Sequence, residues 1–119
     1  MKKIEAIIQP EKLEAVKTAL ISAGVSGMTV SRVEGFGHQK GQVMNYRGTK
    51  YTANFINKVK IDVVVPADMA DLIVDVIVRA AKTGQIGDGK IFVTPVSQVV
   101  RIRTNERDHA ALGNAATVA

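Results

Sequence analysis

Five stretches of the chain alternate apolar and polar residues with the period of a β-strand, and two others show helical spacing. The expected strands are 2–10, 27–36, 58–66, 90–96 and 98–103. The first expected helix, 11–24, has apolar residues about one turn apart, and Gly24 provides a C-terminal stop. The second helix is expected to close at Gly84 and to bury one apolar stripe. That stripe comprises Met69, Leu72, Ile73, Val76, Ile77 and Ala80.

The two halves of the chain repeat one order of elements. The sequence KIEAII from Lys3 matches KIDVVV from Lys60, and each runs into a proline and then a helix followed by glycine. This repeat predicts an α+β fold of order βαββαβ, a ferredoxin-like antiparallel sheet with two helices on one face. The expected apolar face of strand 58–66 comprises Val59, Ile61, Val63 and Val65. Strands so rich in Val and Ile leave a second sheet face that we expect an oligomer to cover.

Residues 37–55 interrupt this pattern, because they show no periodicity between the two inner strands. Hairpin connections usually take about two to five residues, and long connections without secondary structure are generally functional or disordered. We therefore expect the segment 37–55 to carry function. The domain is predicted to span 1–104, and 105–119 to form a polar, alanine-rich tail that is loose or weakly helical.

The net charge of +5 originates in one part of the chain. No acidic residue occurs from Gly35 to Ile61, and the basic residues of that window account for the whole excess. They are Lys40, Arg47, Lys50, Lys58 and Lys60. A basic segment in an otherwise neutral domain indicates an anionic ligand or partner, such as phosphate or nucleic acid. A length of 119 residues, no cysteine, and no signal peptide or membrane span predict a single cytoplasmic domain.

Two glycine-rich stretches could bind an anion. The first, TGQIGDGKIFVTPV at 83–96, surrounds Asp88 and Lys90 with three glycines. Its backbone N–H groups could converge on an anion, or the stretch could be an ordinary loop after a helix C-cap. The second, GFGHQKG at 35–41, permits close backbone approach to a ligand, or is a flexible loop entry.

Arg101 and Arg103 form a third cluster, two residues apart on an expected strand. Their side chains would leave from one face, either as a phosphate clamp or as a solvated edge. Asp62 could accept a hydrogen bond from a sugar hydroxyl or pair with Lys60. His109 and His38 are too isolated to form a metal site or an acid–base pair. No catalytic set is evident, so we do not expect an enzyme.

Together these stretches resemble the PII signal-transduction family of nitrogen regulators, from Met1 to about Thr104. The motifs that carry the resemblance are IEAIIQPEKL, GMTVSRVEGFG, QKG, YRG with a following tyrosine, KVKI, TGQIGDGKIFV and VVRIRT. The resemblance implies a ferredoxin-like homotrimer that binds ATP or ADP between subunits, and 2-oxoglutarate together with Mg-ATP. It also implies that residues 37–55, called the T-loop, change shape with the ligands and dock onto targets. An ammonium transporter is one such target, and would recruit the protein to the membrane.

The resemblance also implies individual site residues. The nucleotide site would comprise Ile7, Thr29, Gly37, His38, Gln39, Lys40, Asp62, Val64, Gly87, Asp88, Gly89, Lys90, Arg101 and Arg103. Among these, Gly87 to Lys90 would line the phosphates, and the two arginines would come from the adjoining subunit. The 2-oxoglutarate site would comprise Gln39, Gly41, Lys58 and Gly87, and Gln39 would also ligate Mg²⁺. Arg47 would enter an ammonium channel, and Tyr51 corresponds to the tyrosine that is nucleotidylated in some members.

The chain departs from the family pattern at several of these positions. His38 replaces the usual arginine, which is expected to alter phosphate affinity or ATP/ADP discrimination. Asp62 replaces a glutamate that is one methylene longer. Thr49 and Lys50 make the T-loop more basic than usual, so a different or narrower set of partners is expected.

The sequence also bears on two other functions. A nucleic-acid-binding ferredoxin-like module could use the basic loop, but the strands lack the stacking aromatics of an RNA-recognition sheet. An ATP-hydrolysing enzyme would need a general base, and no residue suggests itself for that role.

Overall fold

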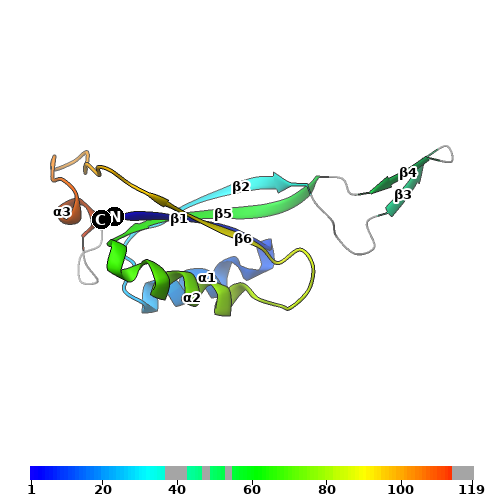
Figure 1. Cartoon of the computed structure of the whole chain (residues 1–119), viewed down its shortest axis with the longest axis horizontal. Coiled ribbons are helices and arrows are strands. Elements are labelled where there is room, and N and C mark those ends of the chain that lie inside the picture. Colours follow the sequence, from blue (N-terminus) through cyan, green and yellow to red (C-terminus); the bar gives the residue numbers. More distant parts are fainter. Residues whose placement is uncertain (37–42, 47–48, 53–54, 114–119) are drawn as a thin grey trace.

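A four-stranded antiparallel sheet with two helices on one face forms the body of the molecule (Figure 1). The computed structural model describes residues 1–36, 43–46, 49–52 and 55–113. The sheet strands are β1 (Lys2–Ile8), β2 (Thr29–Gly35), β5 (Ile56–Val65) and β6 (Gly89–Pro95). The helices are α1 (Leu13–Ser22), α2 (Ala70–Ala81) and the short α3 (His109–Leu112), with 3₁₀ turns η1 (Pro10–Lys12) and η2 (Ala67–Met69). The strand order β2-β5-β1-β6 confirms the predicted ferredoxin-like βαββαβ fold.

The core lies between the helices and one face of the sheet. The predicted apolar face of β5 is confirmed, because Val59, Ile61, Val63 and Val65 are all buried. They pack with Ile4, Ala6 and Ile8 of β1 and with Val16 and Leu20 of α1. The register pairs Ile4 with Val63 and Ala6 with Ile61, so these side chains share one face.

The buried stripe of α2 differs from the predicted one. Its fully packed residues are Ala70, Ile73, Ile77 and Ala81, whereas Leu72 is 52% exposed. Met69, Val76 and Ala80 pack only at the border of the core. The prediction was wrong about Leu72 because small alanines, not the larger neighbouring side chains, mark the closest approach of the helix to the sheet.

The two helices end differently. The predicted stop of α1 is confirmed: Gly24 has a φ of 95°, its N–H donates to Ile21 O, and Val25 N–H donates to Leu20 O. These two bonds form a Schellman motif. Helix α2 instead ends at Ala81, three residues before the predicted stop at Gly84, because Lys82 already has an extended backbone.

A second, two-stranded sheet interrupts the segment 37–55, which was predicted to be without secondary structure. Strands β3 (Val43–Tyr46) and β4 (Thr49–Thr52) pair antiparallel, from Val43 opposite Thr52 to Tyr46 opposite Thr49. Each has only four residues, too few for an alternating pattern to stand out in the sequence. The hairpin projects beyond the ends of β2 and β5 (Figure 1).

The last predicted strand, 98–103, is absent. Strand β6 ends at Pro95, and Val100 forms only an isolated bridge with Arg107. A tight turn follows, in which Arg101 O accepts a hydrogen bond from Asn105 N–H at 2.8 Å and Asn105 has a φ of 61°. The tail contributes the single helical turn α3, in part as predicted, and residues 114–119 lie outside the described residues.

Candidate functional site

The sheet face that the helices leave uncovered carries most of the candidate residues. Strand alternation puts on it Lys3, Glu5 and Ile7 of β1, Lys58, Lys60, Asp62 and Val64 of β5, Thr29, Ser31 and Val33 of β2, and Lys90, Phe92 and Thr94 of β6. This face is therefore mixed and strongly charged, because most of the Val and Ile residues turn toward the helices. It offers cations and acceptors to a ligand as well as apolar contacts.

The loop between α2 and β6, residues 82–88, is shaped by Asp88. Its carboxylate accepts hydrogen bonds from Thr83 N–H at 2.8 Å, from the Thr83 hydroxyl, and from Gly84 N–H at 2.9 Å. These bonds, the Thr83 hydroxyl first, lower the pKa of Asp88 below its ordinary value. The Asp88 carboxylate thus organises the loop from within, while its neighbours Gly87 and Gly89 have φ values of 103° and 108°.

Gly89 is required by close packing as well as by its backbone angle. A Cβ atom added there would lie 1.7 Å from Ile7 O. The glycine lets β6 begin directly beside β1, so that Lys90 stands opposite Ile7 on the open face.

A cleft of about 400 Å³ opens where this loop meets the ends of β2 and β5. Its lining comprises Ile7, Gly35, Phe36, Ile56, Lys58, Ile86, Gly87, Gly89, Lys90 and Phe92. Lys58 is only 8% exposed, and its ammonium donates a hydrogen bond to Gly87 O. Two lysines on an apolar wall suit a ligand that combines an apolar body with negative charge.

Asp62 is a buried acceptor on the same face. One carboxylate oxygen, Oδ1, has no hydrogen-bond partner among the described residues, and Lys3 Nζ lies 3.8 Å from it. Lys60 Nζ lies 3.8 Å from the other oxygen, so the pairing with Lys60 that the sequence indicated is present. A buried acceptor without a partner is costly, and a ligand hydroxyl or amine could satisfy it.

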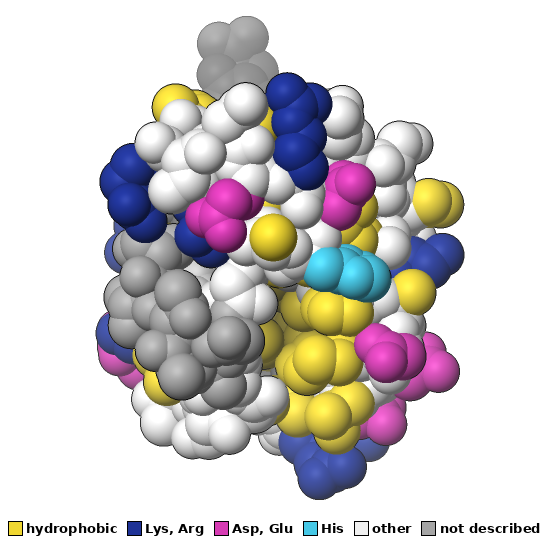
Figure 2. All heavy atoms as spheres, turned by 90° about the vertical axis from the view of Figure 1, so that its left-hand side faces the viewer, with side chains coloured by type: hydrophobic (Ala, Val, Ile, Leu, Met, Phe, Trp, Pro, Cys, Tyr) yellow, Lys and Arg dark blue, Asp and Glu magenta, His cyan; other side chains and the backbone are white. Residues whose placement is uncertain are grey.

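The segment after β6 that holds Arg101 and Arg103 lies at the other end of the molecule from the T-loop hairpin, beside α3 (Figure 1). They occupy a turn, so the prediction that they share one face of a strand is wrong. Arg101 pairs with Glu106 at 2.8 Å, while Arg103 is exposed. Viewed from this end, basic and acidic side chains stand close together beside a band of hydrophobic ones (Figure 2).

Comparison with known proteins decides the family. The model of the family described as nitrogen regulatory protein P-II matches residues 1–106. The chain belongs to the P-II family. It is 59% identical to the nitrogen regulatory protein P-II of Synechocystis sp. (strain ATCC 27184 / PCC 6803 / Kazusa) over 112 residues, which cover 94% of this chain and all of the relative. It is 57% identical, with the same coverage, to nitrogen regulatory protein P-II 1 of Escherichia coli (strain K12).

A solved P-II structure has the same fold. The crystal structure of Arabidopsis thaliana PII bound to citrate matches with a TM-score of 0.77 and 42% sequence identity, covering 92% of this chain and 90% of that one. The P-II proteins are signalling regulators of nitrogen metabolism and not enzymes, so the expectation of a regulator is confirmed. No helix in the part of the chain that the structure describes is long and apolar enough to cross a membrane.

The predicted P-II site residues fall into three groups. Ile7, Lys58, Gly87, Gly89 and Lys90 line the cleft, with Asp88 in the adjoining loop. Thr29, Asp62 and Val64 lie further along the open face, toward the end that carries Arg101 and Arg103. Gly37, His38, Gln39, Lys40, Gly41 and Arg47 lie outside the described residues, and Tyr51 belongs to β4.

Two residues with clear structural roles were not singled out from the sequence. Thr83 supplies two hydrogen bonds to Asp88, and Glu106 pairs with Arg101. Thr83 is the first residue of the glycine-rich stretch 83–96, and a threonine or serine there is a typical turn-forming signal. Glu106 gave no comparable signal, because its partner was expected on a strand that does not form.

Proposed function

We propose that this P-II protein senses ATP or ADP, and 2-oxoglutarate with Mg-ATP, in clefts between the subunits of a homotrimer. One observation carries the proposal: the candidate phosphate ligands sit at opposite ends of a single chain. Gly87 and Lys90 lie at the start of the seven-residue strand β6, and the turn that holds Arg101 and Arg103 follows its far end. An extended strand of that length spans roughly 20 Å. A second copy would bring both groups to one nucleotide.

Exposed apolar side chains at both ends support contact between copies. Ile102, between the two arginines, is 99% exposed, and Phe36, Phe55 and Ile86 near the cleft are also exposed. The rings of Phe36 and Phe55 are in contact, with centroids 5.9 Å apart and a tilt of 55° between their planes, and form one exposed apolar pair. Such side chains are favourable where a neighbouring subunit covers them.

The described residues fit a nucleotide. The Lys90 cation, with Arg101 and Arg103 of a neighbouring subunit, would hold phosphates, and the glycine loop would allow close backbone approach. The unpartnered oxygen of Asp62 would accept a hydrogen bond from the base or the ribose. Ile7, Thr29 and Val64 would complete the adenine and ribose contacts from the open face.

The cleft also fits a small dicarboxylate. Lys58 is a buried cation whose described partner is a carbonyl and not a carboxylate, so it can still pair with an acid. The citrate-bound Arabidopsis relative supports a carboxylic acid as effector. Gln39 and Gly41 would complete this site, and Gln39 would hold the Mg²⁺, which neutralises phosphate charge when bound.

The hairpin of the T-loop would carry the signal to protein targets in nitrogen metabolism. It projects away from the body of the molecule, where a partner can reach it (Figure 1). Arg47 lies between β3 and β4 and would contact an ammonium transporter, which would recruit the protein to a membrane. Tyr51 of β4 is the candidate for nucleotidylation.

Subunit mixing tests the shared cleft. Lys90→Gln and Arg101→Gln each remove one side of every cleft, so each homo-oligomer should bind ATP weakly in calorimetry. Mixed oligomers should regain full-affinity clefts where two unmodified sides meet, in the proportion that random assembly gives. Mixtures that bind no better than either parent would contradict a site built from two subunits.

A further inference from the structure

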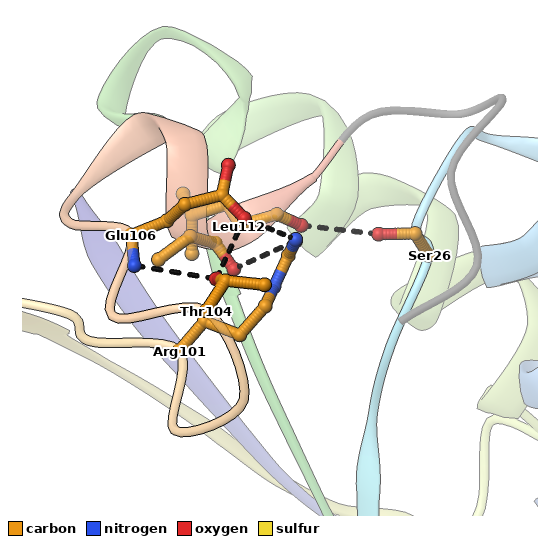
Figure 3. Close-up of polar contacts among 6 residues, drawn as sticks. Ser26, Arg101, Thr104, Glu106 and Leu112 are labelled. Atoms are coloured by element: carbon orange, nitrogen blue, oxygen red, sulfur yellow. Dashed lines mark hydrogen bonds and ion pairs between the residues drawn. The ribbon is translucent and has the colours of Figure 1, made fainter.

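The Arg101 guanidinium is already occupied by a carboxylate of its own chain (Figure 3). Arg101 Nη1 donates to Glu106 Oε1 at 2.8 Å, and Nη2 donates to Ala111 O at 3.3 Å. The same Glu106 oxygen accepts a hydrogen bond from Thr104 Oγ1 at 2.7 Å. The Arg101 side chain is 15% exposed and that of Glu106 42%. The arginine is therefore largely withdrawn from solvent and neutralised.

Glu106 acts on both arginines of the turn. The Thr104 hydroxyl, and after it the charges of Arg101 and Arg103, lower the pKa of this carboxyl, so it stays ionised over the neutral range. A carboxylate and a phosphate offer the same acceptor oxygens to a guanidinium. A phosphate that approaches Arg101 must therefore displace or share the Glu106 contact.

We propose that Glu106 is an internal competitor for the phosphate groups of the nucleotide, holding Arg101 until a phosphate takes its place. The inference rests on the proposed function, because it requires Arg101 to face a nucleotide bound to a neighbouring subunit. Glu106 then lowers nucleotide affinity without touching the ligand. Its removal strengthens binding.

Displacement of Glu106 from Arg101 by a phosphate would also affect helix α3. The Arg101 guanidinium bonds to Ala111 O in α3, and the next residue, Leu112, accepts a hydrogen bond from Ser26 Oγ at 3.1 Å. Release of Arg101 thus loosens one of the contacts that hold α3 beside the segment before β2. Nucleotide binding would be coupled to the position of α3 by this route.

Calorimetric ATP titrations of four proteins test the proposal: wild type, Glu106→Gln, Arg101→Gln and the double variant. The Glu106 side of the pair is open to solvent and such pairs contribute little, so Glu106→Gln should bind ATP about two- to fivefold more tightly. Arg101→Gln should bind more weakly, and adding Glu106→Gln to it should change nothing further. That loss of effect in the double variant identifies direct coupling between the two side chains.

Glu14→Gln is the matched control, because it removes one negative charge from an exposed ion pair with Lys17 on α1. It should leave ATP affinity unchanged. Unfolding temperature and oligomer mass show whether each variant folds. If Glu106→Gln does not fold, Glu106→Asp replaces it; because its side chain is shorter, its gain in ATP affinity should be smaller.

The outcomes separate this inference from the function on which it rests. A wild type that does not bind ATP contradicts the proposed function itself. Wild-type binding with an unchanged or weaker affinity in Glu106→Gln overturns only the internal competitor. An equal gain in the Arg101→Gln background, or in Glu14→Gln, would mean a general charge effect and would also overturn it.

Discussion

The buried ammonium of Lys58 donates a hydrogen bond to the carbonyl of Gly87, joining the inner strand β5 to the glycine loop. No ion pair among the described residues involves Lys58. The chain thus holds a desolvated cation at the cleft wall, where an acidic ligand can neutralise it. An acid that bound Lys58 would compete with this contact and so act on the position of the loop.

Replacing Lys58 with methionine keeps the apolar stem and removes the charge. Hydrogen bonds to charged groups contribute about 1.5–3 kcal/mol, so 2-oxoglutarate affinity in the presence of Mg-ATP should fall at least tenfold. Calorimetry measures the loss, and Lys17→Met on α1 is the control for a removed lysine. An unchanged affinity in Lys58→Met would place the dicarboxylate elsewhere.

Gly89→Ala should destabilise the fold by about 3 kcal/mol, because the added Cβ meets Ile7 O and the φ of 108° strains any other residue. Urea unfolding gives the free energy directly. Gly27→Ala is the matched control, since nothing lies within 4 Å of its Cβ position. Similar stabilities for the two variants would contradict the close approach of β6 to β1.

Thr83→Val should raise the pKa of Asp88 toward its ordinary value, because the hydroxyl is the main cause of the lowered pKa. A carboxyl NMR titration follows this directly. A lowered folded-state pKa means that the Asp88 bonds stabilise the loop at neutral pH. That contribution begins to be lost as the pH falls below the unfolded value of 3.8 and is gone below the folded pKa. In Thr83→Val this pH dependence should be weaker. If the Asp88 pKa is the same in Thr83→Val as in wild type, the Thr83 hydroxyl is not the cause of the lowered pKa.

Ile77→Ala should cost about 2–5 kcal/mol of unfolding free energy, because Ile77 is fully packed between α2 and the sheet. Leu72→Ala, on the exposed side of the same helix, should cost well under half as much. Denaturant unfolding of both variants compares the two faces. Equal losses would favour the stripe expected from the sequence over the observed one.

The fold could be predicted from the sequence because its main signals are local and repeated. The paired sequences from Lys3 and Lys60, each followed by proline and a helix, determine the βαββαβ order. The glycine stop of α1 has a direct physical basis in the left-handed backbone of Gly24.

Other features depend on contacts between distant parts of the chain. The apolar run around Val100 is compatible with a strand, yet Val100 forms only an isolated bridge with Arg107, because the chain turns back after residue 101. Arg101 has two partners, Glu106 and Ala111, and both come near it only because the chain turns back after residue 101. Residue types at fixed spacing do not reveal such a turn.

In the candidate site, too, local signals could be predicted from the sequence and longer-range contacts could not. The glycines and Lys90 of the stretch 83–96 were identifiable in the sequence, whereas the hydrogen bonds by which Asp88 organises its own loop were not. The separation of Lys90 from Arg101 and Arg103 followed only from the topology of the fold. The proposal of a cleft shared between subunits rests on this separation.

Calorimetric titration of 2-oxoglutarate, with and without saturating Mg-ATP, shows whether the two effectors bind this protein together. The sensor proposed here should bind 2-oxoglutarate only when Mg-ATP is present, in wild type and in His38→Arg alike. Binding of equal strength without nucleotide, or no binding under either condition, would contradict a cleft in which the two effectors act together.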